Sequence, residues 1–227
     1  MTSNGRWVCL DVGETLIDET RVWTTWADEL GIPRLTFLAA LGAIIERGGE
    51  HQDVFGVFGI EDWPSMAPRI EARYGGFRDE DLYPDARRAI AGLESAGYGV
   101  AVAANQPARR ADELRALGIG PDVLLMSDAI GVAKPAPAFF ARTLELLGRP
   151  DPGQVAYVGD RMDNDVVPSA AAGMRAVWIR RGPWGYLQRD EVGTAVLEVR
   201  SLDELVERIE EAWAPVPVSA RDPVSPR

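Results

Sequence analysis

The 227-residue sequence has one cysteine, Cys9, and one histidine, His51. A single cysteine cannot form a disulfide within the chain, which fits a reducing cytoplasm, and we expect Cys9 to pack as a small apolar residue in a buried strand. With one histidine and no cysteine cluster, a zinc site is not expected. The chain also has no long apolar run, and its first six residues are polar. We therefore expect neither a signal peptide nor a membrane span, and we expect a cytoplasmic location.

Three sequence motifs are also absent, two that bind nucleotides and one that carries a serine nucleophile. There is no GxxxxGK[ST] loop, no GxGxxG loop and no GxSxG turn, so the sequence gives no support for a nucleoside triphosphatase, a dinucleotide-binding enzyme or a serine hydrolase. The net charge is −11 and no stripe of Lys or Arg occurs, which argues against nucleic acid as a partner. Such an acidic chain would repel a phosphorylated ligand unless a bound cation corrects the field locally.

What is present indicates an α/β fold. Apolar residues make up 46% of the chain, enough for a sizeable core. Short apolar runs predict buried strands at Trp7–Asp11, Gly99–Ala104, Val123–Ser127, Val155–Gly159 and Ala176–Ile179. Between the last four of these strands, apolar residues recur at helical spacing. Strands that alternate with helices predict a Rossmann-like, doubly wound parallel sheet covered on both faces.

Residues 18–80 interrupt this alternation. Two helical stripes, Val22–Leu30 and Phe37–Ile45, follow each other without a strand between them, and a third helix is predicted at about 64–74. We interpret 18–80 as a helical cap inserted after the first strand, with 1–17 and 81–212 forming the core domain. Residues 213–227 hold four prolines and little apolar periodicity, which predicts a disordered tail.

Polar side chains stand at or just beyond the ends of the predicted strands. Asp11 follows the first strand, Asn105 the second, and Asp160 and Asp165 the fourth, while Lys134 lies in a proline-rich loop before the helix that contains Phe139. Because ligands bind at the carboxyl edge of open α/β sheets, we expect these residues to share one site. By themselves, Asn105 could equally satisfy its own loop, and Asp165 could be a helix N-cap.

Three carboxylates at one edge cannot all stay ionised in a small site without compensation. Oxygen ligands with room for water and a phosphate are typical of a Mg²⁺ site. The sequence therefore predicts that Asp11, Asp160 and Asp165 bind Mg²⁺.

In their order and spacing, these four segments resemble the haloacid dehalogenase-like hydrolase superfamily over roughly residues 6–210. The resemblance implies that Asp11 is the nucleophile and forms a covalent aspartyl intermediate that water hydrolyses. It also implies that Mg²⁺ is held by Asp11, Asp160 and the backbone carbonyl of Gly13, with Asp165 orienting that shell. Lys134 would offset negative charge, and Asn105 and Lys134 would bind the substrate.

Two positions depart from that family's pattern. Its phosphatases usually carry an acid–base aspartate two residues after the nucleophile, where this sequence has Gly13. General acid–base help contributes about 10²–10⁴-fold, so turnover would be slow unless another group substitutes. Glu14, in the same turn, and His51, in the predicted cap, are the candidates for such a group. The second departure is Ala104, where the family usually has a hydroxyl that binds the phosphoryl group; one charge-assisted hydrogen bond is worth about 1.5–3 kcal/mol.

Three functions remain open at this point. The first is a Mg²⁺-dependent phosphatase, weak or narrow, acting on a small phosphorylated metabolite. The second is a 2-haloacid dehalogenase, whose halide leaving group needs no proton; Arg21, Arg34 or Arg47 of the cap would then bind the substrate carboxylate. The third is a catalytically impaired ligand-binding or regulatory protein. A phosphonate hydrolase is disfavoured because segment 16–80 has no lysine. We expect a monomer or a homodimer, no nucleic-acid partner and no membrane partner.

Overall fold

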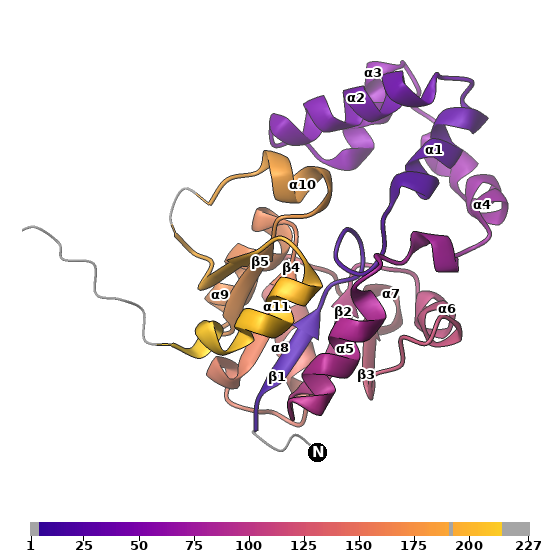
Figure 1. The fold of residues 1–227 in the computed structure, drawn as a ribbon. Helices are drawn as coiled ribbons and strands as arrows, with labels where there is room; N and C mark the ends of the chain where they lie inside the picture. Colours follow the sequence, from indigo (N-terminus) through magenta and orange to yellow (C-terminus); the bar gives the residue numbers. More distant parts are fainter. Residues whose placement is uncertain (1–4, 191–192, 215–227) are drawn as a thin grey trace, which may run out of the picture.

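A six-stranded sheet forms the centre of the molecule, as the computed structural model of residues 5–190 and 193–214 shows (Figure 1). All five strand pairs are parallel, in the order β3-β2-β1-β4-β5-β6. The strands are β1 (Trp7–Leu10), β2 (Gly99–Ala104), β3 (Val123–Met126), β4 (Val155–Gly159), β5 (Arg175–Ile179) and β6 (Leu197–Val199). The predicted doubly wound α/β fold is therefore confirmed. The first five strands match the predicted ones to within one residue at each end, and β6 was missed because its three residues, with an exposed Glu198 in the middle, make no apolar run.

Helices cover both faces of the sheet. They are α5 (Ala86–Ser95), α6 (Arg110–Ala116), α7 (Ser127–Ile130), α8 (Pro137–Leu146), α9 (Val167–Ala171), α10 (Gly182–Leu187) and α11 (Leu202–Arg208). Alternate residues of one strand serve opposite faces: Val8 and Leu10 pack in the cluster that includes α5 and α11, whereas Cys9 packs in the cluster that includes α8. Cys9 is fully buried, as expected. No helix of the described residues is long and apolar enough to cross a membrane.

The helices between β1 and α5 stand over the carboxyl ends of the strands (Figure 1). They are α1 (Thr20–Glu29), α2 (Arg34–Glu46), α3 (Val54–Val57) and α4 (Trp63–Tyr74), with short 3-10 turns η1 (His51–Asp53) and η2 (Asp79–Asp81). They surround an apolar cluster of their own, in which Trp26, Phe37 and Phe55 are buried. The core contributes Trp184 of α10 to the same cluster, and α10 packs against α2.

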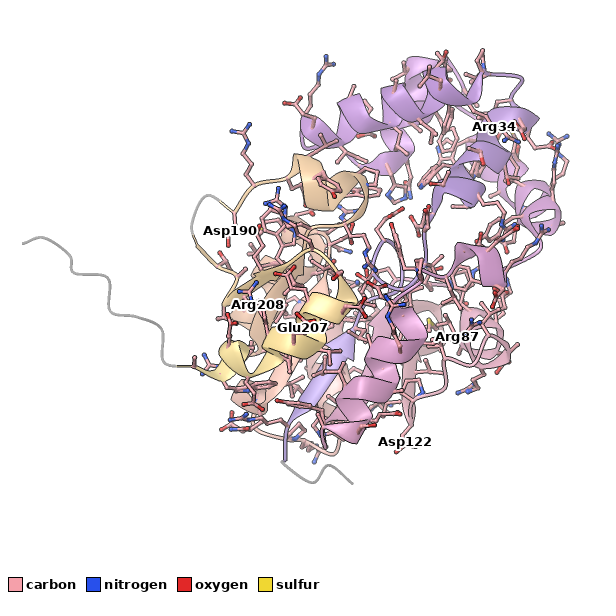
Figure 2. The ribbon with its side chains drawn as sticks, in the orientation of Figure 1. Arg34, Arg87, Asp122, Asp190, Glu207 and Arg208 are labelled. Atoms are coloured by element: carbon pink, nitrogen blue, oxygen red, sulfur yellow. The ribbon has the colours of Figure 1, made fainter. Side chains whose placement is uncertain are left out.

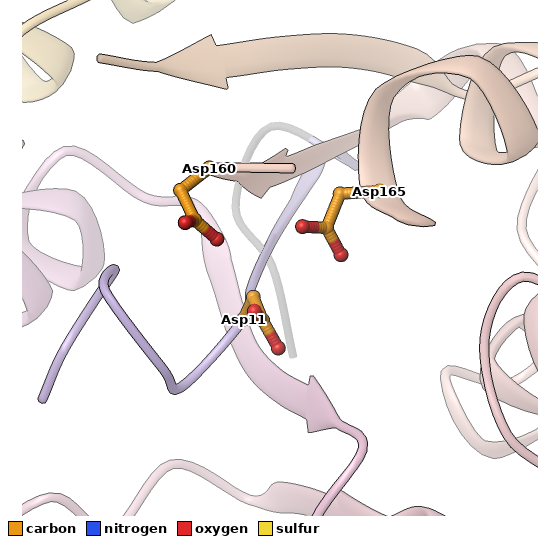
Figure 3. Close-up of side chains that lie close together, drawn as sticks. All are labelled: Asp11, Asp160 and Asp165. Carbon is orange, nitrogen blue, oxygen red and sulfur yellow. The ribbon is translucent and has the colours of Figure 1, made fainter. Parts of the chain in front are cut away.

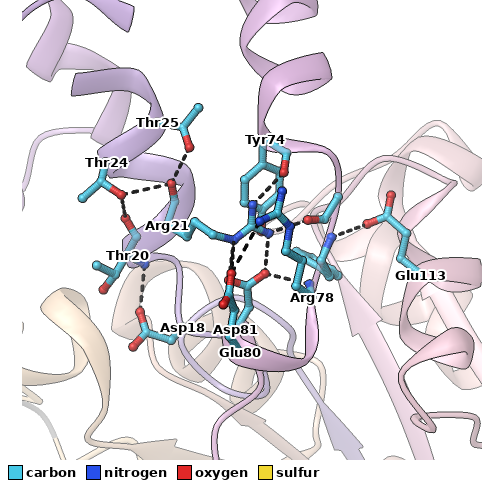
Figure 4. A network of polar contacts seen from close by, with 12 residues as sticks. Asp18, Thr20, Arg21, Thr24, Thr25, Tyr74, Arg78, Glu80, Asp81 and Glu113 are labelled. Carbon is cyan, nitrogen blue, oxygen red and sulfur yellow. Dashed lines mark hydrogen bonds and ion pairs between the residues drawn. The ribbon is translucent and has the colours of Figure 1, made fainter. Parts of the chain in front are cut away.

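The two chain segments that enter and leave this helical insertion run side by side. Asp18 donates its N–H to the carbonyl of Asp81 at 2.8 Å, and Tyr83 donates to Leu16 at 3.0 Å. Arg21 of α1 reinforces the crossing (Figure 4), because its guanidinium binds both oxygens of Asp81, at 2.7 and 2.5 Å, and the backbone carbonyl of Tyr74 at 2.6 Å. The two segments at the base of the insertion thus form a paired crossing that joins it to the core.

The end of the chain differs in part from the predicted tail. Trp213, placed in that tail, closes a 3-10 turn, η5 (Ile209–Trp213), and its indole N–H donates to the carbonyl of Gly153 at 2.9 Å. Its ring also stacks on Tyr98. The rest of the predicted tail, 215–227, lies outside the described residues.

Candidate functional site

Three buried carboxylates converge at the carboxyl edge of the sheet (Figure 3). Asp11 follows β1, Asp160 follows β4, and Asp165 lies in a π-helical turn, η4 (Met162–Val166). One oxygen from each lies within 4.8 Å of the others. These are the three carboxylates that the sequence predicted at one site, and the parallel register of β1 with β4 is what brings the first two together.

The amine of Lys134 joins two of these carboxylates. Its Nζ lies 2.6 Å from Asp11 Oδ1 and 2.6 Å from Asp165 Oδ1, and its side chain is only 1% exposed. Lys134 is also the only lysine of the whole sequence, so every other lysine-or-arginine position is an arginine. A buried charge of this kind stabilises only when it is paired and hydrogen-bonded, and here both conditions hold.

Asn105 lies beside this group and holds the lysine's loop. Its side-chain amide donates to the backbone carbonyl of Lys134 at 2.9 Å, and its Oδ1 accepts the N–H of Lys134 at 2.8 Å. Asn105 also lines the cavity described below. The reciprocal pair fixes the backbone of Lys134, a role that the sequence did not reveal; a contact between Asn105 and the substrate stays a prediction.

The tight turn after β4 depends on a glycine. A Cβ on Gly159 would lie 2.3 Å from Cγ of Asp165, so only glycine lets that carboxylate approach the strand. The other oxygen of Asp165, Oδ2, accepts the N–H of Arg161 at 3.0 Å. Asp165 therefore closes the turn and binds Lys134 at once, and its side chain does not cap the helix α9 that follows.

Burial and mutual repulsion dominate the electrostatics. Burial raises the pKa of Asp11 to about 6, although the neighbouring Lys134 lowers it and Asp165 raises it further. Burial, then the charges of Asp165 and Asp11, raise the pKa of Asp160 well above its usual range. Burial by itself would lower the pKa of Lys134, but the two carboxylates outweigh it and raise that pKa. One lysine thus faces three acidic groups, and the site has a deficit of positive charge.

Asp160 gives the clearest indication of a missing partner. Its Oδ2 is buried without a hydrogen-bond partner among the described residues, although such atoms are rarely left unpaired. A divalent cation among oxygen ligands would satisfy this atom and supply the positive charge that the group lacks. The predicted ligands Asp11, Asp160 and Asp165, with Gly13 at the same cavity, fit such an ion.

A small cavity of about 110 Å³ opens beside the three carboxylates. Its walls come from both parts of the chain: Asp11, Gly13, Glu19, His51, Asn105, Gln106, Lys134, Asp160, Arg161, Asn164 and Trp184. Ligand pockets usually measure about 300–1,000 Å³, so this one fits only a small substrate. Sequence reasoning missed Glu19, Gln106, Arg161, Asn164 and Trp184. Arg161 could have been suspected from its place after Asp160, but nothing in the sequence singles out Glu19 or Trp184.

The candidates for the missing acid–base group occupy different places. Glu14 is buried away from the cavity, where its Oε2 accepts the hydroxyl of Tyr83 at 2.5 Å. His51 does line the cavity, with its ring against Trp23 and Trp184, at 5.4 and 6.0 Å between ring centres. Burial lowers the pKa of His51, and the charge of Arg161 lowers it further. Burial, followed by the charges of Glu14 and Asp11, raises the pKa of Glu19 to about 8.

The three cap arginines considered for a dehalogenase do not line the cavity. Arg21 binds Asp81 at the crossing. Arg34 pairs with Asp28 and lies on the outer part of the insertion, far from the sheet (Figure 2). Arg47 is exposed. The arginine that does line the cavity, Arg161, belongs to the core and binds Asp163 at 2.6 Å.

Known proteins share both the sequence pattern and the fold. Residues 6–173 match the family described as haloacid dehalogenase-like hydrolase. The chain is 33% identical to a phosphoserine phosphatase of Thermus thermophilus over 115 residues, which cover 49% of this chain and 46% of that protein. It is 32% identical to a glyceraldehyde 3-phosphate phosphatase of Methanopyrus kandleri over 133 residues, 57% of either chain. The chain thus spans about half the length of these curated relatives.

Solved structures match over a longer range. A HAD phosphatase from Thermococcus onnurineus matches with a TM-score of 0.59 and 26% identity over 90% of this chain and 97% of that one. The L-2-haloacid dehalogenase of Xanthobacter autotrophicus shares the fold, with a TM-score of 0.67 and 18% identity over 90% and 98% of the two chains. Because the family match covers most of the chain and includes Asp11, Lys134, Asp160 and Asp165, this protein belongs to the haloacid dehalogenase-like hydrolases.

Proposed function

We propose that the chain is a Mg²⁺-dependent phosphatase that acts on a small phosphorylated metabolite through an aspartyl phosphate on Asp11. The observation that carries this proposal is the pairing of Asp11 with Lys134 at 2.6 Å, inside a group of three carboxylates that faces a cavity of about 110 Å³. The phosphatase relatives support the same reaction class.

Each residue has a chemical part in this reaction. A carboxylate oxygen of Asp11 attacks phosphorus, while Lys134 holds that carboxylate in place and offsets the charge of the incoming phosphoryl group. Asp165 fixes Lys134, and Asn105 fixes the backbone of the lysine's loop. Asp11, Asp160 and the Gly13 carbonyl would hold Mg²⁺, with Asp165 orienting them. The ion when bound would supply Lewis-acid stabilisation of charge on phosphoryl oxygens.

Charge and size favour this reading over the dehalogenase. Three carboxylates and one amine repel a phosphate dianion, so the proposed substrate needs a divalent cation in the site. A 2-haloacid instead needs a cation that binds its carboxylate, and the cations among the described lining residues, Lys134 and Arg161, are already paired with carboxylates. The cap would restrict the substrate to a phosphate ester with few carbon atoms.

A panel assay tests the proposal. Purified protein is given O-phosphoserine, glyceraldehyde 3-phosphate and 2-chloropropionate, with Mg²⁺ or with a chelator. We expect phosphate release that requires Mg²⁺ and falls about 10⁴-fold or more in Asp11→Asn. The matched control is Asp122→Asn, because Asp122 is exposed just before β3, at the opposite edge of the sheet (Figure 2), and its variant should keep full activity.

Other outcomes would select the remaining functions. Chloride release without metal would establish a dehalogenase. Stabilisation by Mg²⁺ with no turnover on any phosphate would leave a ligand-binding protein. The metal part has its own readout: Mg²⁺ at about 100 times its Kd should stabilise the folded protein by about 2.7 kcal/mol, and Asp160→Asn should abolish most of that gain in a thermal unfolding scan.

A further inference from the structure

The carboxylate of Glu19 lies directly over Gly13. A Cβ built on Gly13 would be 2.6 Å from Glu19 Oε1 and 3.0 Å from its Cδ. Both residues line the cavity that also contains Asp11. A carboxylate from the start of α1 therefore takes up the space where a side chain of residue 13, two positions after Asp11, would begin.

The backbone of Glu19 is tied to the loop after Asp11. Its N–H donates to Glu14 Oε1 at 3.0 Å, and the other oxygen of Glu14 accepts the hydroxyl of Tyr83 at 2.5 Å. Glu14 has a left-handed backbone, with φ of 51°, and its side chain binds Glu19 and Tyr83 and does not line the cavity. Glu14 thus positions the start of α1 rather than acting at the site.

Breaking a phosphate ester of an alcohol requires a proton for the departing oxygen, and the cavity offers few groups that can give one. Its described carboxylates are Asp11, Asp160 and Glu19, of which only Glu19 lies outside the three-carboxylate group. The amine of Lys134 is held between Asp11 and Asp165. His51 also lines the cavity, and its ring makes edge contacts with Trp23 and Trp184.

We propose that Glu19 is the general acid and general base of this enzyme and replaces the group that Gly13 lacks. The proposal rests on the phosphatase function given above. As an oxygen of Asp11 bonds to phosphorus, the bond from phosphorus to the ester oxygen breaks, its electron pair stays on that oxygen, and the carboxyl proton of Glu19 moves to it. The alcohol leaves. Glu19, now a carboxylate, accepts a proton from water while the water oxygen attacks phosphorus and the bond to Asp11 breaks. Phosphate leaves, and both residues return to their starting forms.

Two small phosphates of similar size separate this role from a structural one. Ethyl phosphate releases an alkoxide that must be protonated, whereas acetyl phosphate releases acetate, which leaves as a stable anion. We expect Glu19→Gln to slow phosphoenzyme formation from ethyl phosphate about 10²–10⁴-fold, and from acetyl phosphate less than about tenfold. With acetyl phosphate the variant should also accumulate the Asp11 phosphate adduct in intact-protein mass spectrometry, because its hydrolysis lacks the base.

A second variant tests the position rather than the residue. Glu19→Ala empties the space over Gly13, and adding Gly13→Asp to it returns a carboxylate to that place from the other side. We expect the double variant to hydrolyse ethyl phosphate at least about tenfold faster than Glu19→Ala does. The matched control is Glu61→Gln, an exposed glutamate in the loop before α4 that does not line the cavity, which should behave as the parent protein.

The failures of the two proposals are distinguishable. If the parent protein forms no phosphoenzyme from either compound, the phosphatase function fails. If the parent protein uses acetyl phosphate but not ethyl phosphate, or if Glu19→Gln slows both compounds equally or neither, the phosphatase function stands and the role of Glu19 is overturned.

Discussion

The two parts of the chain that meet at the cavity are built on different principles. The sheet edge supplies short, charged, buried side chains, each fixed at the end of a different strand or loop, and Lys134 joins two of them. The helical insertion supplies mainly large aromatic rings that pack on one another, such as Phe55 against Trp63 at 5.1 Å. Only Glu19 and His51 of the insertion reach the cavity in the described structure. Most of the charged groups at the cavity therefore come from the sheet edge, and the insertion adds Glu19 and His51.

Removing the charge of Lys134 should have the largest effect, and it should act on the stability of the sheet edge. Lys134→Met would leave Asp11 and Asp165 buried without their cation, and breaking a buried pair costs about 3–5 kcal/mol. We expect the urea midpoint to fall accordingly in the absence of metal, and Mg²⁺ to restore part of the loss. A midpoint that does not change would mean that the amine contributes no net stability to the sheet edge.

Trp184 is where the two parts meet, and its truncation should affect both of them. Trp184→Ala removes a nearly buried ring from the cluster of the insertion, and large-to-small changes of this kind cost about 3 kcal/mol or more. The cavity should also widen, so the KM for phenyl phosphate should fall relative to that for ethyl phosphate. Trp213→Ala is the control: its ring stacks on Tyr98 in the core, so this variant should lose stability without changing the KM ratio.

Of these three places, the crossing between the insertion and the core should lose the least stability on substitution. Arg21→Lys replaces a fork of hydrogen bonds to Asp81 and to two backbone carbonyls with a single ammonium group, and bonds to charged groups are worth about 1.5–3 kcal/mol. We expect a loss in that range, with faster amide exchange at Asp18 and Tyr83. Arg34→Lys, at an exposed pair with Asp28 that solvent screens, should change the stability much less. Equal losses in the two variants would deny Arg21 any special part in the crossing.

The sheet and its reactive edge were predictable because their signals are local. An apolar run that ends in Asp11 or in Gly159-Asp160 predicts both a strand and the place where a ligand binds, and the parallel order then brings the ends together. The helical stripes of the insertion were equally clear. The exact use of Asn105 was not, because an amide at a strand end can bind a substrate, a loop or a neighbouring backbone, and the sequence does not choose among them.

The features that were missed depend on tertiary contacts. Glu19 reaches the cavity by lying over Gly13, and Trp184 reaches it from the short helix α10, which packs against α2. No periodic pattern or motif in the sequence marks either residue. Substrate recognition at the insertion side thus depends on placement in space, whereas the chemistry at the sheet edge depends on spacing along the chain.

The solitary lysine has a practical consequence. Protein labelled with nitrogen-15 only in its lysine should give one side-chain ammonium signal by magnetic resonance, and that signal comes from the amine between Asp11 and Asp165. The chain thus carries a built-in reporter at its reactive centre. Metal binding, phosphorylation of Asp11 and opening of the cavity to solvent each change the surroundings of this one nitrogen, so each event can be followed without introducing a foreign probe.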